Sequence, residues 1–134
     1  LKKQHRNIFG KPIVNEPAHI VALRSLDKIR TQNLWQNNKQ KQYYTAITDT
    51  LRVYISDRYN LSAMEMTSNE ILDILSKDKE LEQRVYEDLS SLFTTADLVK
   101  FAKYLASEEE NQDAIPIAVR FVNATFLQEL EENR

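Results

Sequence analysis

Apolar side chains recur along most of this chain at steps of three and four residues, which is the period of one face of an α-helix. The clearest such stripe consists of Tyr43, Ile47, Leu51, Tyr54 and Ile55. A loop over residues 60–66 interrupts the period. Thr67 and Glu70 then have the spacing of a capping box, in which each side chain accepts a hydrogen bond from the other residue's backbone N–H. Residues 43–75 are therefore predicted to form two packed helices joined by a loop.

The same period predicts a helix before this unit. Pro17 fits the first turn of a helix, where its missing N–H costs nothing, and the apolar spacing continues to about residue 32. The amide-rich segment 36–40 predicts a turn, and the following helix should run from about residue 39 to residue 59. Arg52 and Arg58 lie near Asp49 and Asp57, a mixture that predicts ion pairing on the helix surface.

Three further helices are expected downstream of the capping box, which itself should open a short helix to residue 75. Asp78 is predicted to cap the next one. Thr94 or Thr95 should cap a fifth helix with the apolar positions Leu98, Phe101, Ala102 and Leu105. Ser107 and Glu110 form a second capping box before the last helix. Pro116 lies inside that last helix and predicts either a kink or a break near residue 115.

Composition supports an all-α fold. The chain of 134 residues suits one domain with one core, and its single glycine and three prolines are too few for a sandwich or barrel. Cysteine is absent, which excludes disulfides and thiolate metal sites. We predict a single-domain, all-α bundle of five or six helices over residues 17–134, preceded by an extended arm over residues 1–16.

No catalytic pattern is visible. His5 and His19 are the only histidines, and neither has a carboxylate at metal-ligand spacing. Glycine-rich phosphate cradles are missing. We therefore expect no enzymatic activity, no metal and no cofactor.

The charge is distributed unevenly. Residues 1–64 hold eleven Lys or Arg and four Asp or Glu, a balance of +7, whereas residues 65–134 have a balance of −9. This indicates either a polarised domain, with a basic portion near an anionic surface, or halves that the fold interleaves without functional meaning. In the arm, Lys2, Lys3 and Arg6 fit the cytoplasmic flank of an upstream transmembrane helix, and equally an ordinary soluble tail.

Three other residues are candidates for partner contacts. Trp35 is a possible binding anchor, although a lone Trp in a helical domain belongs more often to the core or its rim. In the loop, Glu65 is expected to be exposed, while Met64 or Met66 is expected to be buried. The six tyrosines are interpreted as core or rim residues rather than a stacking platform for nucleic acid.

Several segments resemble a helical cytosolic domain of unknown function found in Bat-type, aerotolerance-related bacterial membrane proteins. The resemblance spans roughly residues 17–126, and its most specific pieces are AMEMT at 63–67 and ADLVKFA at 96–102. The genes of that family accompany MoxR-type AAA+ ATPases and von Willebrand factor A domain proteins. The arm and Pro116 match the family poorly.

The resemblance implies a domain that follows a transmembrane helix, on the cytoplasmic side of the bacterial inner membrane. It implies a protein partner, a MoxR-type ATPase or a von Willebrand factor A protein, and no assigned catalytic residues or small-molecule substrate. Our leading hypothesis is a non-catalytic protein-protein interaction domain. The alternative is a nucleic-acid-binding regulatory domain that uses the basic N-terminal portion, although the acidic segment around Glu70 would repel phosphate.

Overall fold

A computed structural model describes residues 16–133, and this part of the chain is helical with no strand. Four helices are long, namely α1 (Ala18–Thr31), α2 (Gln40–Tyr59), α4 (Gln83–Phe101) and α5 (Glu108–Glu132). One helix is short, α3 (Ser68–Leu75), and the 3-10 helices η1 (Trp35–Asn37) and η2 (Ala63–Glu65) lie in the connections. The predicted all-α bundle is confirmed. The predicted arm, apart from Glu16, lies outside the described residues.

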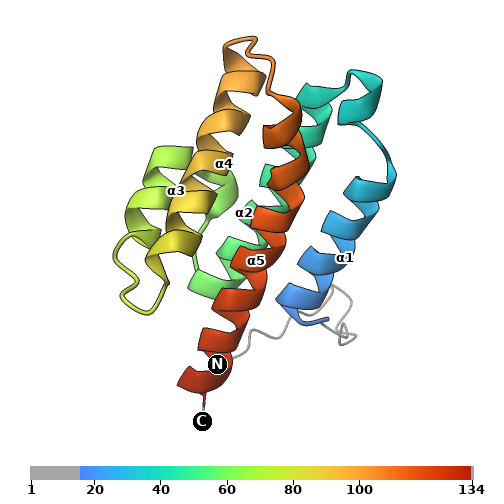
Figure 1. Ribbon diagram of the computed structural model, residues 1–134. Coiled ribbons are helices and arrows are strands. Elements are labelled where there is room, and N and C mark those ends of the chain that lie inside the picture. Colours follow the sequence, from blue (N-terminus) through green and yellow to red (C-terminus); the bar gives the residue numbers. More distant parts are fainter. Residues whose placement is uncertain (1–15, 134) are drawn as a thin grey trace, which may run out of the picture.

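The four long helices alternate in direction, and α3 lies beside α4 (Figure 1). Helix α2 is central, since it contacts α1, α4 and α5. Two hydrogen bonds fix α2 parallel to α5, one from Tyr44 to Asn111 and one between Tyr54 and Thr125. None of the helices within residues 16–133 is long and apolar enough to cross a membrane.

The core follows the predicted stripe of α2. Its five predicted members are all buried, as are Tyr44, Thr48 and Arg52 on the flanks of the stripe. The buried face is wider than predicted because other helices cover α2 on three sides. Both predicted capping boxes are also present. The bonds between Thr67 and Glu70 measure 3.1 and 2.8 Å, and those between Ser107 and Glu110 measure 3.0 and 2.8 Å.

The predicted break at Thr94 and Thr95 is wrong, because α4 runs without interruption from Gln83 to Phe101. Its buried face continues on both sides of the two threonines, through Val85, Leu89, Leu92, Phe93, Ala96 and Val99. Burial of this continuous stripe stabilises the helix more than a local cap would stabilise an interruption. The chain therefore has five α-helices within the described residues.

Asp78 does not cap α4, which begins after Glu82 without a side-chain cap. Instead its Oδ2 accepts hydrogen bonds from the Tyr59 hydroxyl at 2.9 Å and from Gln128 Nε2 at 3.1 Å. Asp78 thus joins the end of α2 to α5. The sequence could not show this, because the partners lie 19 and 50 residues away.

Helix α5 is continuous through Pro116, so of the two predicted alternatives, a kink or a break, the break is wrong. Pro116 is exposed, and its missing N–H removes only the bond that would reach the carbonyl of Gln112. Neighbouring turns keep their bonds and bury Ala114, Ile115 and Ala118 in the core. Packing over 25 residues outweighs one lost bond.

The predicted surface pairing of Arg52 and Arg58 is also wrong, because both guanidinium groups lie inside the fold. The Arg58 side chain is only 8% exposed, and its Nε donates to the backbone carbonyl of Thr125 at 2.9 Å. Its single ion pair within the described residues is a 3.5 Å contact with Glu132 at the end of α5. A basic residue of the N-terminal half is therefore used to hold α2 against α5.

Candidate functional site

Two hollows in the surface of the described part of the chain each contain a residue that the sequence had marked. One is a groove that contains Trp35, and the other is a cleft that contains Met64. The two differ in chemistry. The groove is walled by apolar side chains, whereas the cleft holds charged groups beside exposed apolar ones.

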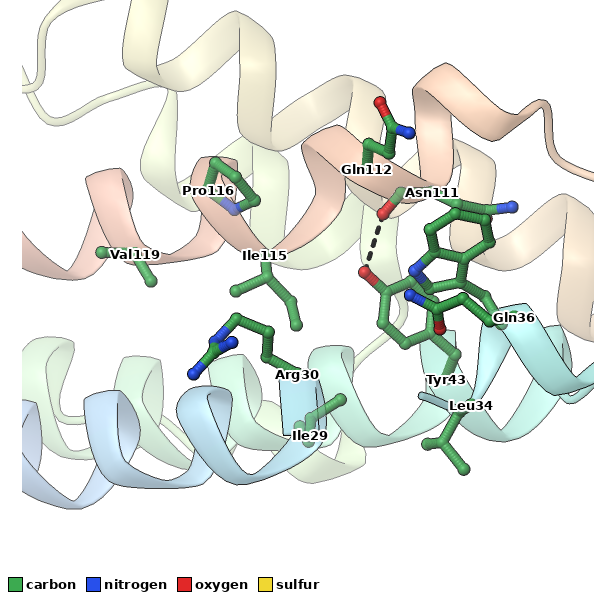
Figure 2. Close-up of a pocket in the computed structure, with 11 residues that line it drawn as sticks. Ile29, Arg30, Leu34, Gln36, Tyr43, Asn111, Gln112, Ile115, Pro116 and Val119 are labelled. Atoms are coloured by element: carbon green, nitrogen blue, oxygen red, sulfur yellow. Dashed lines mark hydrogen bonds between the residues drawn. The ribbon is translucent and has the colours of Figure 1, made fainter. Parts of the chain in front are cut away.

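The groove lies between the end of α1, η1 and α5 (Figure 2) and has a volume of about 380 Å³. Trp35 lies half-buried at its edge and packs against the core, which confirms its interpretation as a core-rim residue. Across the groove floor, the Tyr43 hydroxyl donates to the backbone carbonyl of Asn111 at 2.7 Å. The apolar walls are formed by Ile29, Leu34, Ile115, Pro116 and Val119. Such walls can accept an apolar side chain. The polar side chains of Arg30, Gln36 and Gln112 also line the groove, and Arg30 is already paired with Asp27.

The cleft has a volume of about 480 Å³ and lies between α2, η2, the start of α3 and the C-terminal half of α4. Its lining includes Met64, Met66 and Thr67 from one segment, and Asp97, Lys100 and Phe101 from another. These are the two segments, 63–67 and 96–102, on which the family resemblance rests. The tertiary structure therefore brings them together as walls of one cleft.

Arg52 of α2 forms part of the cleft and is only 8% exposed. Its Nη2 donates to the Met66 carbonyl at 3.4 Å and to Ser68 Oγ at 3.3 Å, and the guanidinium lies 5.4 Å from the centre of the Phe93 ring. Ser68 Oγ in turn donates to Asp97 Oδ1 at 3.1 Å. This chain of hydrogen bonds joins α2, α3 and α4.

Lys100 is the second cation of the cleft. Its Nζ donates to Thr48 Oγ1 at 3.3 Å and lies 5.4 Å from the centre of the Phe101 ring. Burial lowers the pKa of Lys100, and the positive charge of Arg52 lowers it further, while Asp97 and Asp49 act in the opposite direction. Within residues 16–133, neither Arg52 nor Lys100 has a carboxylate oxygen within 4.0 Å.

Large apolar side chains are exposed around this cleft and along the end of α4. Phe101 is 78% exposed and Leu105 is 80% exposed. We call this region the Phe101 surface, and it comprises Met64, Leu98, Phe101, Tyr104 and Leu105. The sequence had placed Leu98, Phe101, Ala102 and Leu105 on the apolar stripe of a fifth helix. That prediction is wrong, because α4 ends at Phe101 and no helix within residues 16–133 covers these side chains.

The other sequence-predicted residues are distributed as follows. Neither methionine of the loop is fully buried, contrary to the prediction, because Met64 is exposed and lines the cleft and Met66 is half-buried. The fully buried residue of this loop is Ala63. Glu65 is exposed as predicted, next to the cleft but outside its lining. Lys2, Lys3 and Arg6 lie outside the described residues.

Sequence reasoning missed Arg52, Lys100 and Phe101 as site residues. Arg52 lies beside the buried apolar stripe of α2, and lysines such as Lys100 are common on protein surfaces. Neither residue therefore forms a sequence pattern that indicates a binding site. Leu98, Phe101 and Leu105 do form an apolar pattern in the sequence, but that pattern was interpreted as the buried face of a fifth helix. An apolar stripe reports amphipathicity without reporting whether the same chain covers it.

Metal chemistry finds no support in the described part. No group of three or more His, Asp or Glu side chains within residues 16–133 is arranged to hold a metal ion. His19 stacks on Phe126 with ring centres 3.6 Å apart. Comparisons with family models, with curated proteins and with solved structures found no match to this chain.

Proposed function

We propose that this chain is a non-catalytic protein-binding domain that docks a partner through the Phe101 surface. The observation that carries the proposal is a set of large exposed apolar side chains, with Leu98 and Phe101 on the face of α4 away from its buried stripe and Leu105 in the segment that follows. Single exposed apolar residues are common, but several large ones within eight residues, two of which are on one helix face and one of which lines a cleft, are typical of a protein interaction site.

The Phe101 surface includes the end of α4 and the segment that follows it, which lie at one end of the bundle, where a partner can reach them. In Figure 1 the connection between α4 and α5, drawn in orange, lies at the opposite end of the bundle from the start of α1.

The family resemblance suggests which partner to test first, a MoxR-type ATPase or a von Willebrand factor A protein. Its two most specific segments form walls of the cleft at the Phe101 surface. Nucleic-acid binding is less well supported by the described residues. Of the cations of the basic half, the exposed Arg24 and Arg30 each pair with a carboxylate, of Glu16 and Asp27, and Arg52 and Arg58 are mostly buried.

The proposal is tested by size-exclusion chromatography and biolayer interferometry with the MoxR-type and von Willebrand factor A proteins of the same organism. Low salt and nucleotide should be present. We expect co-elution with one of them, and we expect Phe101→Ser and Leu105→Ser to raise the Kd about tenfold or more each.

Leu127→Ser and Leu130→Ser are the matched controls, because these exposed leucines lie at the far end of α5. They should leave the Kd unchanged. Absence of co-elution with both proteins, or binding that Phe101→Ser and Leu105→Ser leave intact, would remove the proposal.

A further inference from the structure

We infer that the cleft beside Phe101 binds an Asp or Glu side chain of the partner, presented next to an apolar residue. This inference rests on the proposed function and specifies the chemistry of the partner's docking segment. Its basis is the pair of cations on the cleft lining, Arg52 and Lys100, together with the apolar side chains of Met64 and Phe101.

The guanidinium of Arg52 has donors left over. Its hydrogen bonds within residues 16–133 use only Nη2, so Nε and Nη1 have no partner there. No buried side-chain nitrogen or oxygen of the described residues lacks a hydrogen bond, and these two nitrogens must therefore reach solvent. Because the residue is only 8% exposed, the approach to them is from the cleft that it lines. The N–H groups of Nε and Nη1 point in different directions, because Cδ lies on the Nη1 side of the guanidinium, so each can donate a single hydrogen bond to a ligand oxygen.

Lys100 adds a second positive charge to the same cleft. Its ammonium has three donors, and one hydrogen bond, to Thr48, is present within the described residues. Burial and, after it, the charge of Arg52 lower the pKa of Lys100, as expected for two cations that line the same cleft. A carboxylate bound between them would be attracted by both and would offset their repulsion.

The two aspartates of the cleft, Asp49 and Asp97, do not form ion pairs with Arg52 or Lys100. Asp97 Oδ1 accepts from Ser68, and neither Asp97 nor Asp49 approaches Arg52 or Lys100 within 4.0 Å. Their charges oppose the binding of a free anion, so a ligand needs an additional source of binding energy. The exposed side chains of Phe101 and Met64 at the cleft provide it for an apolar neighbour of the carboxylate. A peptide segment has both groups, whereas inorganic phosphate has only the charge.

The experiment is a selection of displayed random octapeptides on the immobilised full chain. We expect enrichment of peptides in which Asp or Glu is adjacent to Leu, Ile, Met or Phe. The most enriched peptide is then labelled with fluorescein, and its Kd is measured by anisotropy beside a copy in which Gln replaces each acidic residue. The Gln copy should bind about tenfold more weakly or worse.

Variants of the chain assign the effect to the cleft. Lys100→Gln should raise the Kd of the acidic peptide several-fold and leave that of the Gln copy unchanged. Lys28→Gln, which removes an exposed lysine of α1, is the matched control and should change neither. Phe101→Ser should weaken both peptides. Arg52→Lys, checked for folding by circular dichroism, should also weaken binding of the acidic peptide, because it removes the Nε and Nη1 donors.

The outcomes separate this inference from the proposed function. Enriched peptides without carboxylates, or acidic peptides whose Kd is unaffected by Lys100→Gln, would overturn the carboxylate site and leave apolar docking intact. Competition by inorganic phosphate at concentrations equal to the peptide would overturn it in favour of a general anion site. Failure of every peptide to bind, together with failure of the partner proteins to co-elute, would remove both.

Discussion

The hydroxyl of Tyr44 donates a 2.8 Å hydrogen bond to Oδ1 of Asn111, and both side chains are buried at the contact between α2 and α5. Beside it, the Tyr43 hydroxyl donates to the backbone carbonyl of the same asparagine at 2.7 Å. Burial raises the pKa of Tyr43 to about 12, so this ring stays neutral and can donate throughout the physiological range. Two adjacent tyrosines thus fix the first turn of α5 against the central helix.

Tyr44→Phe should lower the free energy of unfolding by about 1–3 kcal/mol, because the buried Asn111 oxygen loses its donor while the ring volume is kept. Urea unfolding followed by circular dichroism measures the change. Tyr104→Phe is the control, since that hydroxyl bonds to Glu110 at the surface. A loss for Tyr44→Phe no larger than for Tyr104→Phe would contradict a role for the buried bond.

Thr94→Ala should leave stability unchanged or raise it by a few tenths of a kcal/mol, because Thr94 is an exposed residue inside α4 and Ala has the higher helix propensity. Thr67→Ala should instead cost about 1 kcal/mol, because it removes a capping hydroxyl. Thermal unfolding of the two variants in parallel gives the comparison. A destabilised Thr94→Ala protein would indicate that a helix begins there after all.

Acid should destabilise the start of α5 through Glu110. The backbone N–H of Ser107 lowers the pKa of this carboxyl below its ordinary value of 4.5, with contributions from the Tyr104 and Thr95 hydroxyls. A lowered folded-state pKa means that the stabilisation is present above the unfolded pKa and is lost as the pH falls through the folded-state value. Urea unfolding at a series of pH values should therefore show a steeper loss below about 4.5 in the native protein than in Glu110→Gln. Parallel curves would contradict this.

Pro116→Ala should raise the free energy of unfolding by about 1–3 kcal/mol, because the new N–H restores the helical bond to the Gln112 carbonyl in an otherwise continuous helix. The exposed position leaves room for the exchange. Urea unfolding measures the gain, and Pro17→Ala, at the N-cap of α1, should bring no comparable increase. A destabilised Pro116→Ala protein would show that the ring's contacts in the Trp35 groove outweigh the missing bond.

Sequence patterns predicted the helices well where the structural feature depends only on residues close together in the chain. Both capping boxes depend on residues three positions apart, and both form as predicted. The stripe of α2 is buried at all five predicted positions. Asp78, Thr94 and Thr95 also resemble caps, yet tertiary contacts use Asp78 as an acceptor between helices and keep α4 continuous through the threonines.

The sequence by itself determined that the chain is an all-α bundle, that α3 and α5 start at capping boxes, and which face of the central helix is buried. These follow from hydrogen-bond spacing and from the 3.6-residue period, which act within a few residues. Only the tertiary structure decided that Arg52 and Arg58 lie inside, that Leu98, Phe101 and Leu105 lie outside, and that segments 63–67 and 96–102 share one cleft. The reason is physical, because burial depends on which helix covers a face, and that is set by contacts between residues far apart in the chain.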